Sequence, residues 1–254
     1  MRLNERVTVG AATAALLPAL LLGAVGCSSE GVPAAGKAPD PKGSAPAASP
    51  GGAPSGSAAP KAGASKLERS ALEQGDLPGY QVSAQGKNPN APDGQPQADR
   101  KACQPLADIM GDKPDPAARE TVNRGVGSQK QVGLAVSASV SSYAESDAKA
   151  LIARLKDAVA ACGTGFSATV EKQSGSYRDV RPAEYKAAGD ESVSWTTTAA
   201  AQGVSAQVHV VVVRQGATVV RLMALNVAAA AAQQKPQVPH EVADKQLEKV
   251  RSAG

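Results

Sequence analysis

Aromatic residues are scarce in this chain of 254 residues, which has four tyrosines, one tryptophan and one phenylalanine. No stretch combines basic residues with aromatic ones, although that combination is typical of surfaces that contact nucleic acids. The formal charge of +4 does not indicate a surface for nucleic acids either. Residues 1–66 hold six basic and three acidic residues, which leaves the remainder of the chain with +1. We therefore expect no nucleic-acid partner.

Histidine is also rare, with only His209 and His240 in the chain. Neither belongs to a spaced cluster of His, Asp and Glu, and no G-x-S-x-G motif marks a nucleophilic serine. His209 lies within a strand pattern, where we expect it on the less buried face and without a catalytic role. The adjacent residues Asp190 and Glu191 predict a turn rather than a catalytic pair, because neighbouring strand residues point to opposite faces. We expect a protein that is not an enzyme and that holds no metal and no cofactor.

No apolar run is long enough to span a membrane. The longest, at residues 7–22, has about 16 residues, whereas a spanning helix needs roughly 20. Arg2 and Arg6 precede this run, and the small residues 23–26 and then Cys27 follow it. This order is typical of a secretory signal peptide.

The segment that ends at Cys27 resembles the lipobox of bacterial lipoproteins, although Ala24 stands where that group usually has leucine. The resemblance implies that residues 1–26 are a signal peptide and that the thiol of Cys27 receives a diacylglyceryl group. Acyl chains such as palmitate would then anchor the protein on the outer face of the cytoplasmic membrane without a spanning helix. The alternative is a plain signal peptide cut elsewhere, which leaves Cys27 as a free thiol.

Residues 27–66 contain almost no large apolar side chain. Glycine, proline, alanine and serine dominate, and Val32 is the largest apolar residue after Cys27. Nothing here can offset the conformational entropy lost on ordering, so we expect a disordered linker. All six aromatics lie beyond it, and residues 67–254 are therefore expected to form one extracellular domain.

Cysteine is sparse, and its count is informative. If Cys27 carries lipid, only Cys103 and Cys162 remain. An even pair in an oxidising compartment predicts a disulfide, and no C-x-x-C motif or nearby histidine favours a redox or metal site. The bridge would close a loop of about 60 residues, which is worth about 4 kcal/mol in the chain-entropy model.

The strongest helical pattern covers residues 145–162. Its apolar residues recur at spacings of three and four and form one stripe: Ala148, Ile152, Leu155, Val159 and Cys162. A capping box of Ser142 and Glu145 is expected at the start of the helix, and Gly163 is expected to end it.

Shorter patterns complete a mixed fold. Helices are expected at 67–74, near 103–110 and at 239–250, and an exposed loop is expected at 85–100. Alternating patterns predict strands at residues 80–82, 119–124, 131–143, 166–172, 177–185, 192–198, 204–213 and 219–227. Pro182 places the 177–185 strand at an edge, and the last two strands form a hairpin with a turn at 215–216. The order predicts an α+β protein, with a twisted antiparallel sheet packed against helices on one face. Val211 and Val213 make the other face apolar near the hairpin turn, where we expect a helix or another chain to cover it.

Several stretches occur in a set order: DLPGY at 76–80, Cys103 beside a short helix, SSYAESDAKA at 141–150, AVAACGTGF at 158–166, GDES at 189–192 and the valine hairpin. Together they resemble the exported lipoproteins and sensor domains of high-GC Gram-positive bacteria, such as the LpqN-like lipoproteins and the extracellular domains of PknH-type receptor kinases. The resemblance covers about residues 67–250. It implies an antiparallel sheet with a groove beside a long helix, disulfide bracing, and binding rather than catalysis. The PknH-type domains have two disulfides, whereas this domain has cysteines for one. No kinase domain is expected here, so signalling would need a partner.

These expectations favour a tethered, sensor-like domain that binds a ligand or partner of the cell envelope. Two alternatives stay open. The domain could carry lipid or another apolar molecule, because residues 210–213 and 219–222 make both faces of the hairpin tip apolar. It could equally be a structural or docking protein of the cell wall. The sequence assigns no ligand-binding residue.

Overall fold

The computed structural model describes residues 64–85, 94–111, 114–227 and 234–254. The expected signal peptide, Cys27 and the linker up to residue 63 lie outside the described residues. The helices are α1 (Lys66–Ser70), a 3₁₀ turn (Lys101–Cys103), α2 (Gln104–Met110), α3 (Glu145–Ala161) and α4 (His240–Ser252). The strands are β1 (Tyr80–Gln85), β2 (Gln97–Ala98), β3 (Glu120–Ser128), β4 (Leu134–Ser142), β5 (Phe166–Val170), β6 (Gln173–Pro182), β7 (Glu191–Ala201), β8 (Val204–Gln215) and β9 (Thr218–Asn226). This is an α+β fold, as the sequence predicts.

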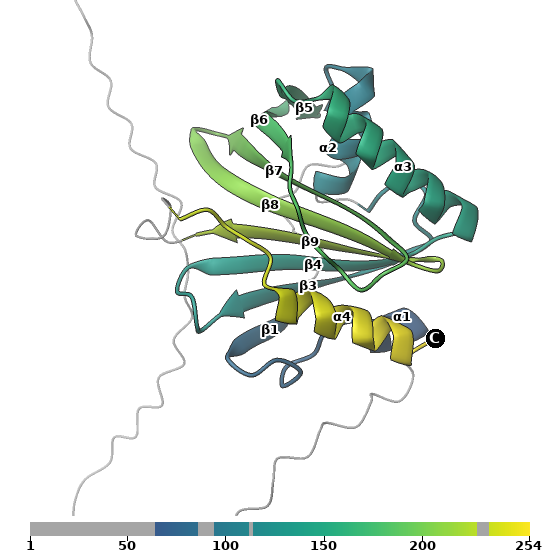
Figure 1. Ribbon diagram of the computed structural model, residues 1–254. Helices are drawn as coiled ribbons and strands as arrows, with labels where there is room; N and C mark the ends of the chain where they lie inside the picture. The colour runs from purple at the N-terminus through teal and green to yellow at the C-terminus, as the bar shows by residue number, and fades with distance from the viewer. Residues whose placement is uncertain (1–63, 86–93, 112–113, 228–233) are drawn as a thin grey trace, which may run out of the picture. The chain divides into compact units, whose positions relative to one another are not determined.

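The described strands form one antiparallel sheet in the order β1-β3-β4-β9-β8-β7-β6-β5-β2 (Figure 1). β8 and β9 form the predicted hairpin near the centre. Gln215 pairs with Thr218, so the two-residue turn lies at 216–217, one position later than predicted. Gly216 has a φ of 60°, which is the left-handed conformation that such tight turns favour.

Helices cover both faces of this sheet. The sequence predicted helices against one face and a cover of some kind, a helix or another chain, over the other face near the hairpin turn. Val211 and Val213 pack on the side of α1 and α4, and Val210 and Val212 pack on the side of α2 and α3. Figure 1 shows the two helix pairs at separate places on the sheet. Near its turn, the hairpin is apolar on both faces, and each face therefore gains from a cover that excludes water.

α3 carries the predicted apolar stripe toward the sheet. Its buried residues are Ala148, Leu151, Ile152, Leu155, Ala158 and Val159. The predicted capping box is absent, because Ser142 still pairs with Thr218 at the end of β4. Ala144 is the N-cap instead, and it makes no side-chain hydrogen bond to the helix.

Gly165, rather than Gly163, supplies the left-handed backbone after α3. Its φ is 100°, and a Cβ at this position would collide with the Tyr177 carbonyl oxygen. The Arg100 guanidinium donates to the carbonyl oxygens of Ala161 and Gly165, at 2.9 and 3.0 Å. The bond to Ala161, the last residue of α3, satisfies an acceptor that the end of a helix leaves without an intrahelical partner.

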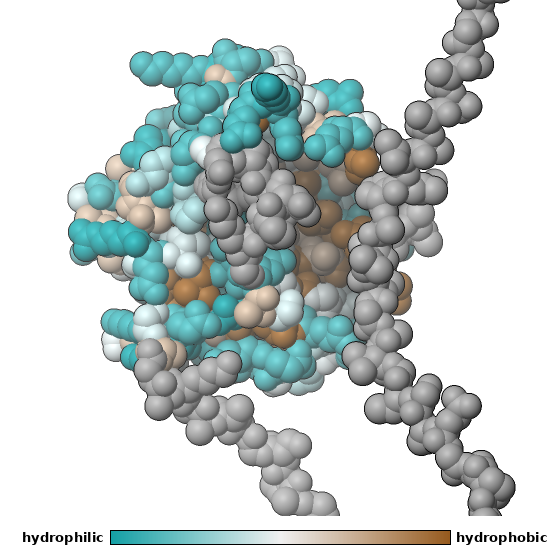
Figure 2. All heavy atoms as spheres, turned by 180° about the vertical axis from the view of Figure 1, so that it is seen from behind, coloured by the Kyte–Doolittle hydropathy of each residue, from teal (hydrophilic) through white to brown (hydrophobic). Residues whose placement is uncertain are grey.

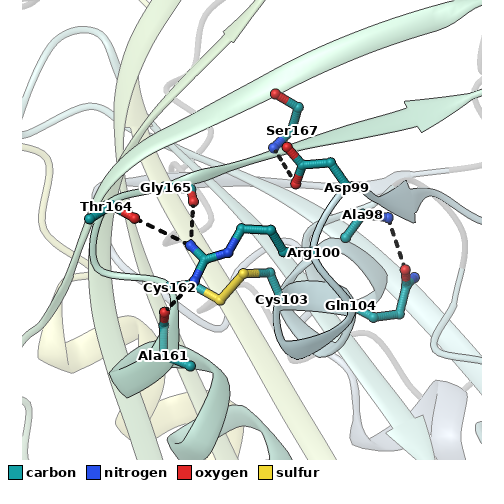
Figure 3. Close-up of a disulfide and its surroundings, with 10 residues drawn as sticks. All are labelled: Ala98, Asp99, Arg100, Cys103, Gln104, Ala161, Cys162, Thr164, Gly165 and Ser167. Atoms are coloured by element: carbon teal, nitrogen blue, oxygen red, sulfur yellow. Dashed lines mark hydrogen bonds between the residues drawn. A yellow bond between two sulfur atoms is a disulfide. The ribbon is translucent and has the colours of Figure 1, made fainter.

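A disulfide joins Cys103, just before α2, to Cys162 at the end of α3 (Figure 3). The two sulfur atoms are 2.02 Å apart and the Cα atoms 5.9 Å apart. Both cysteines are fully buried, and Arg100 extends beside the bridge toward the end of α3 (Figure 3). The bridge is the one that the cysteine count predicts, and it holds α2 and α3 together.

Several local predictions were wrong for tertiary reasons. Val132 lies within the strand predicted at residues 131–143, but it is 79% exposed because β4 begins only at Leu134. Pro182 does not mark an edge strand, since β6 lies between β5 and β7 and the proline is its last residue. Residues 97–98 form a short strand in the region expected to be a loop. The first helix ends at Ser70 rather than at residue 74.

Candidate functional site

An open groove lies at the start of α4, and we call it the α4 groove. Its volume is about 390 Å³, within the range of small-molecule sites. Three segments that are distant in the sequence form its walls. The lining residues are Tyr80, Ser128, Lys130, Gln131, Gln237, Val238, Pro239, His240 and Glu241.

The DLPGY motif places Tyr80 in this lining. Gly79 has a φ of 79°, and the Tyr80 N–H donates to the Leu77 carbonyl oxygen at 3.2 Å, which closes the turn. The Asp76 carboxylate accepts a hydrogen bond from Lys249 of α4 at 2.7 Å. The motif is therefore bound to α4, and Tyr80 is only 5% exposed.

Gln246 of α4 secures the chain that leads into this motif. Its Oε1 accepts from the Leu72 N–H at 3.2 Å, and its Nε2 donates to the Ser70 carbonyl oxygen at 2.6 Å. Gln246 is fully buried. A buried amide with both ends paired is stable only in this arrangement of α1 and α4, because an unpaired buried polar group is costly.

An ion pair lies over Tyr80. Lys130 Nζ is 3.0 and 3.1 Å from the two carboxylate oxygens of Glu241, and it is 5.2 Å from the centre of the Tyr80 ring. The Tyr80 hydroxyl donates to Glu241 Oε1 at 2.5 Å. A Cβ on Gly79 would come within 2.8 Å of Lys130 Cε, so the glycine leaves space for the lysine stem.

These contacts determine the protonation states in the groove. Burial raises the pKa of Tyr80 to about 12, and the hydrogen bond and charge of Glu241 add to the rise. Hydrogen bonds from Tyr80 and Lys130 hold the pKa of Glu241 below its ordinary value. At neutral pH the groove therefore presents a neutral phenol and an ionised carboxylate, and Lys130 pairs with that carboxylate.

A buried histidine holds the back wall of the groove. The Val238 N–H donates to His209 Nδ1 at 3.0 Å, and His209 Nε2 lies 2.8 Å from Ser194 Oγ. His209 is 3% exposed, so the expectation of the less buried face was wrong, because α4 and the segment before it cover that face of β8. Burial lowers the pKa of His209 to about 4, and its ring is neutral at neutral pH.

The hydrogen bond between Ser194 and His209 runs in the opposite direction from that between a catalytic serine and its histidine base. Because Nδ1 accepts a backbone N–H, the proton of the neutral ring is on Nε2, which donates to Ser194. Ser194 Oγ donates in turn to the Val210 carbonyl oxygen at 3.0 Å. A catalytic serine needs an imidazole nitrogen that accepts its proton. Sequence reasoning missed this pair, since no motif marks two residues on paired strands.

Two other pockets differ from the α4 groove in size. The pocket beside α2 has a volume of about 20 Å³, which holds about one water molecule. The Arg221 guanidinium in its lining donates to the Ile109 carbonyl oxygen at 2.8 Å and to Ser139 Oγ at 2.6 Å. The second pocket, of about 210 Å³, is lined by Thr198, Ser205, Ala206, Gln207, Asn226, Gln234 and Pro236.

Among the residues that the structure describes, none of the three pockets lies at α3, the long helix beside which the resemblance implied a groove. Leu151, Ile152 and Leu155 of α3 are at most 1% exposed, and none of the three pockets draws a lining residue from this helix. The acidic residues Asp190 and Glu191 both bind Arg214, at 2.9 and 3.1 Å. They brace the β8–β9 turn.

The apolar hairpin tip has a structural explanation. Val210, Val211, Val212 and Val213 are completely buried under the helices on the two faces. Among the described residues, the large hydrophobic side chains that are exposed are Val132, Val204 and Val227. Seen from behind, much of the surface is hydrophilic, and hydrophobic residues gather mainly towards the right of the view (Figure 2).

Comparison with known proteins yields structural neighbours only. No family model matches the sequence, and no curated protein matches it. The extracellular domain of PknH from Mycobacterium tuberculosis is similar with a TM-score of 0.46 and 13% identity, over 74% of this chain and 94% of that chain. A putative uncharacterized protein from Mycobacterium smegmatis, an Rv0999 ortholog, is similar with a TM-score of 0.37 and 11% identity, over 70% of this chain and 90% of that chain. These similarities assign no function, and membership of the lipoprotein family stays a prediction.

Within the ranges that the structure describes, no helix combines the length and the apolar character that a membrane span requires. In the same ranges, no group of three or more His, Cys, Asp and Glu side chains is arranged to hold a metal ion.

Proposed function

We propose that this chain is a membrane-anchored extracellular lipoprotein whose folded domain binds a polar ligand or partner in the α4 groove and catalyses no reaction. The observation that carries the proposal is the cluster of Tyr80, Lys130 and Glu241, in which a buried phenol and a paired carboxylate and ammonium line an open groove. Groups that are already held in place lose little conformational freedom on binding, which favours affinity.

The lining indicates what kind of ligand fits. Gln131 and Gln237 supply amide donors and acceptors, and the Lys130–Glu241 pair supplies one charge of each sign. The lining contains few large apolar side chains, of which Val238 is completely buried. A ligand rich in hydroxyl and amide groups and close to neutral would therefore match the groove better than an aliphatic chain would.

The anchor is proposed to be lipid on Cys27, with residues 28–66 as the tether. The order of basic residues, short apolar run, small residues and cysteine supports it, and so does a buried disulfide, which is typical of exported proteins. Metabolic labelling with palmitate should label the full-length protein and should fail in Cys27→Ala. Labelling that persists in this variant would contradict the anchor.

Site-specific photocrosslinking in intact cells tests the groove. A photoreactive residue at Gln131 lies in the groove lining, and one at Ser252 lies on an exposed position at the other end of α4. We expect an adduct from position 131 that disappears when Glu241→Ala is added, and no adduct from position 252. Equal adducts at both positions, or an adduct indifferent to Glu241→Ala, would show that binding takes place elsewhere.

The alternative functions have less support. A carrier of lipid needs accessible apolar surface, but the valines of the hairpin tip are packed against helices. A structural or docking role in the cell wall needs no groove. It predicts crosslinks at other surfaces that Glu241→Ala leaves unchanged, so the same experiment separates it from ligand binding.

A further inference from the structure

One imidazole ties the back wall of the α4 groove to the sheet. Val238, whose N–H binds His209, lines the α4 groove, while Gln234 and Pro236 line the neighbouring pocket. We propose that His209 is an acid-sensitive latch, whose protonation releases residues 234–239 from β8 and remodels the walls of both sites. The effect on the α4 groove rests on the proposed function, but the latch can be tested without any ligand.

The hydrogen bonds of His209 require a neutral ring. Nδ1 accepts the Val238 N–H at 3.0 Å, and Nε2 is engaged with Ser194 Oγ at 2.8 Å. A proton added to Nδ1 would remove the lone pair that the Val238 N–H uses and would place two N–H groups face to face. The bond to Val238 must then break. The segment has a second tie at its other end, where Asn226 Nδ2 donates to the Gln234 carbonyl oxygen at 2.6 Å.

The surroundings of His209 do not favour a charged ring. From the β6–β7 connection, Tyr185 lies with its ring centre 5.6 Å from that of His209. From α4, His240 stacks on Tyr185 with ring centres 4.3 Å apart and disfavours a positive charge on His209. The strand neighbours of His209, Thr196 and Ala224, are uncharged.

Other ionisable groups near this cluster do not compensate the charge. Burial, and then the carboxylate of Asp244, raise the pKa of Tyr185, so the phenol stays neutral. Glu241 is already engaged by Tyr80 and Lys130. A protonated His209 is therefore better solvated when the segment has moved away from β8 and water can reach the ring.

The size of the effect follows from linkage. In the closed state burial lowers the pKa of His209 from 6.5 to about 4, whereas in the open state the ring has its ordinary pKa. Acid therefore favours the open state, and the population of opened molecules should rise about 30-fold between pH 7.5 and pH 5. Well above pH 6.5 the ring is neutral in both states, and the pH has little further effect.

Hydrogen exchange of the Val238 amide in the full-length protein tests the latch. We expect the protection factor of this amide to fall about 30-fold from pH 7.5 to pH 5. His209→Gln offers an amide oxygen and an NH₂ group that do not titrate, so its Val238 protection should not depend on pH. His240→Gln is the matched control at the neighbouring histidine and should keep the pH dependence.

The latch is overturned if the protection factor of the Val238 amide does not change with pH in the wild type, or if it falls equally in His209→Gln. It is also overturned if the fall is lost in His240→Gln but kept in His209→Gln. If His209→Gln does not fold, NMR of the wild-type imidazole decides. We expect its titration midpoint well below 6.5, together with a shift of the Val238 amide. A ring that titrates near 6.5 while the Val238 amide stays unchanged overturns the proposal. If the Val238 amide responds to pH as expected but position 131 gives no crosslink, the proposed function is refuted and the latch is not.

Discussion

Removal of the Cys103–Cys162 disulfide should weaken the domain strongly without changing its fold. The two cysteines are 59 positions apart in the sequence, and a bridge that closes a loop of this length stabilises by about 4 kcal/mol in the chain-entropy model. The double variant Cys103→Ala, Cys162→Ala loses this contribution. The fold should survive, because Leu106 and Ile109 of α2 remain buried in the core that α3 shares.

The loss can be measured by thermal and urea unfolding of the full-length protein. For a domain of 150–250 residues, 1 kcal/mol corresponds to about 2–4 °C, so the Tm should fall by about 8–16 °C. Cys27→Ala is the control, since it keeps the bridge and should leave domain unfolding unchanged. In the native wild type, both sulfurs are buried, and a reducing agent should therefore act slowly unless denaturant is added.

A decrease of the Tm by less than about 3 °C would refute the reasoning. It would mean that the unfolded chain gains little freedom when the loop opens, or that α2 detaches without unfolding of the sheet. Hydrogen exchange separates these two cases. Local detachment would remove protection from the amides of α2 and leave those of β8 and β9 unchanged.

Three further predictions concern Gln246 beneath the α4 groove, Gly165 after α3, and the Tyr80 ring in the groove. Gln246→Leu should cost about 2–4 kcal/mol in urea unfolding, because a buried N–H and a buried C=O lose their partner; a cost below about 1 kcal/mol would contradict this. Gly165→Ala should lower the free energy of unfolding by about 2 kcal/mol or more. Gly203→Ala is the control, because Gly203 has a φ of 80° and no atom within 4 Å of the added Cβ, and it should lower the free energy of unfolding by about 1 kcal/mol. Equal losses would exclude the clash with Tyr177. The NMR signal of the Tyr80 ring should remain that of a neutral phenol up to about pH 11, and Glu241→Gln should lower its titration midpoint.

Patterns that depend on neighbours in the sequence predicted much of this fold. The apolar stripe of α3 recurs with the helical period, and its residues are buried as expected. The valine alternation predicted β8 and β9, and the cysteine count predicted the pair that is bridged. Such features are accessible because the periodicity of a helix or strand relates side-chain direction directly to sequence position.

The α4 groove could not be predicted in this way. Tyr80 and Glu241 are 161 positions apart, and Lys130 is 111 positions from Glu241. The DLPGY motif was visible in the sequence, but its tyrosine gains a role only from the loop after β3 and the start of α4. The prediction that His209 lies on the less buried face was wrong. Its burial depends on the segment before α4, where the Val238 N–H donates to His209 Nδ1.

The sequence alone predicts the α+β class, the valine hairpin, the long helix and the pair of cysteines. It also predicts the anchor at Cys27. Only the tertiary structure decided that α1 and α4 are the helices that cover the second face of the sheet, that His209 is buried and neutral, and that three distant segments meet in a groove. The reason is physical. Periodicity records which side of an element is apolar, whereas the partner of a polar group depends on how elements pack, and no local pattern records that packing.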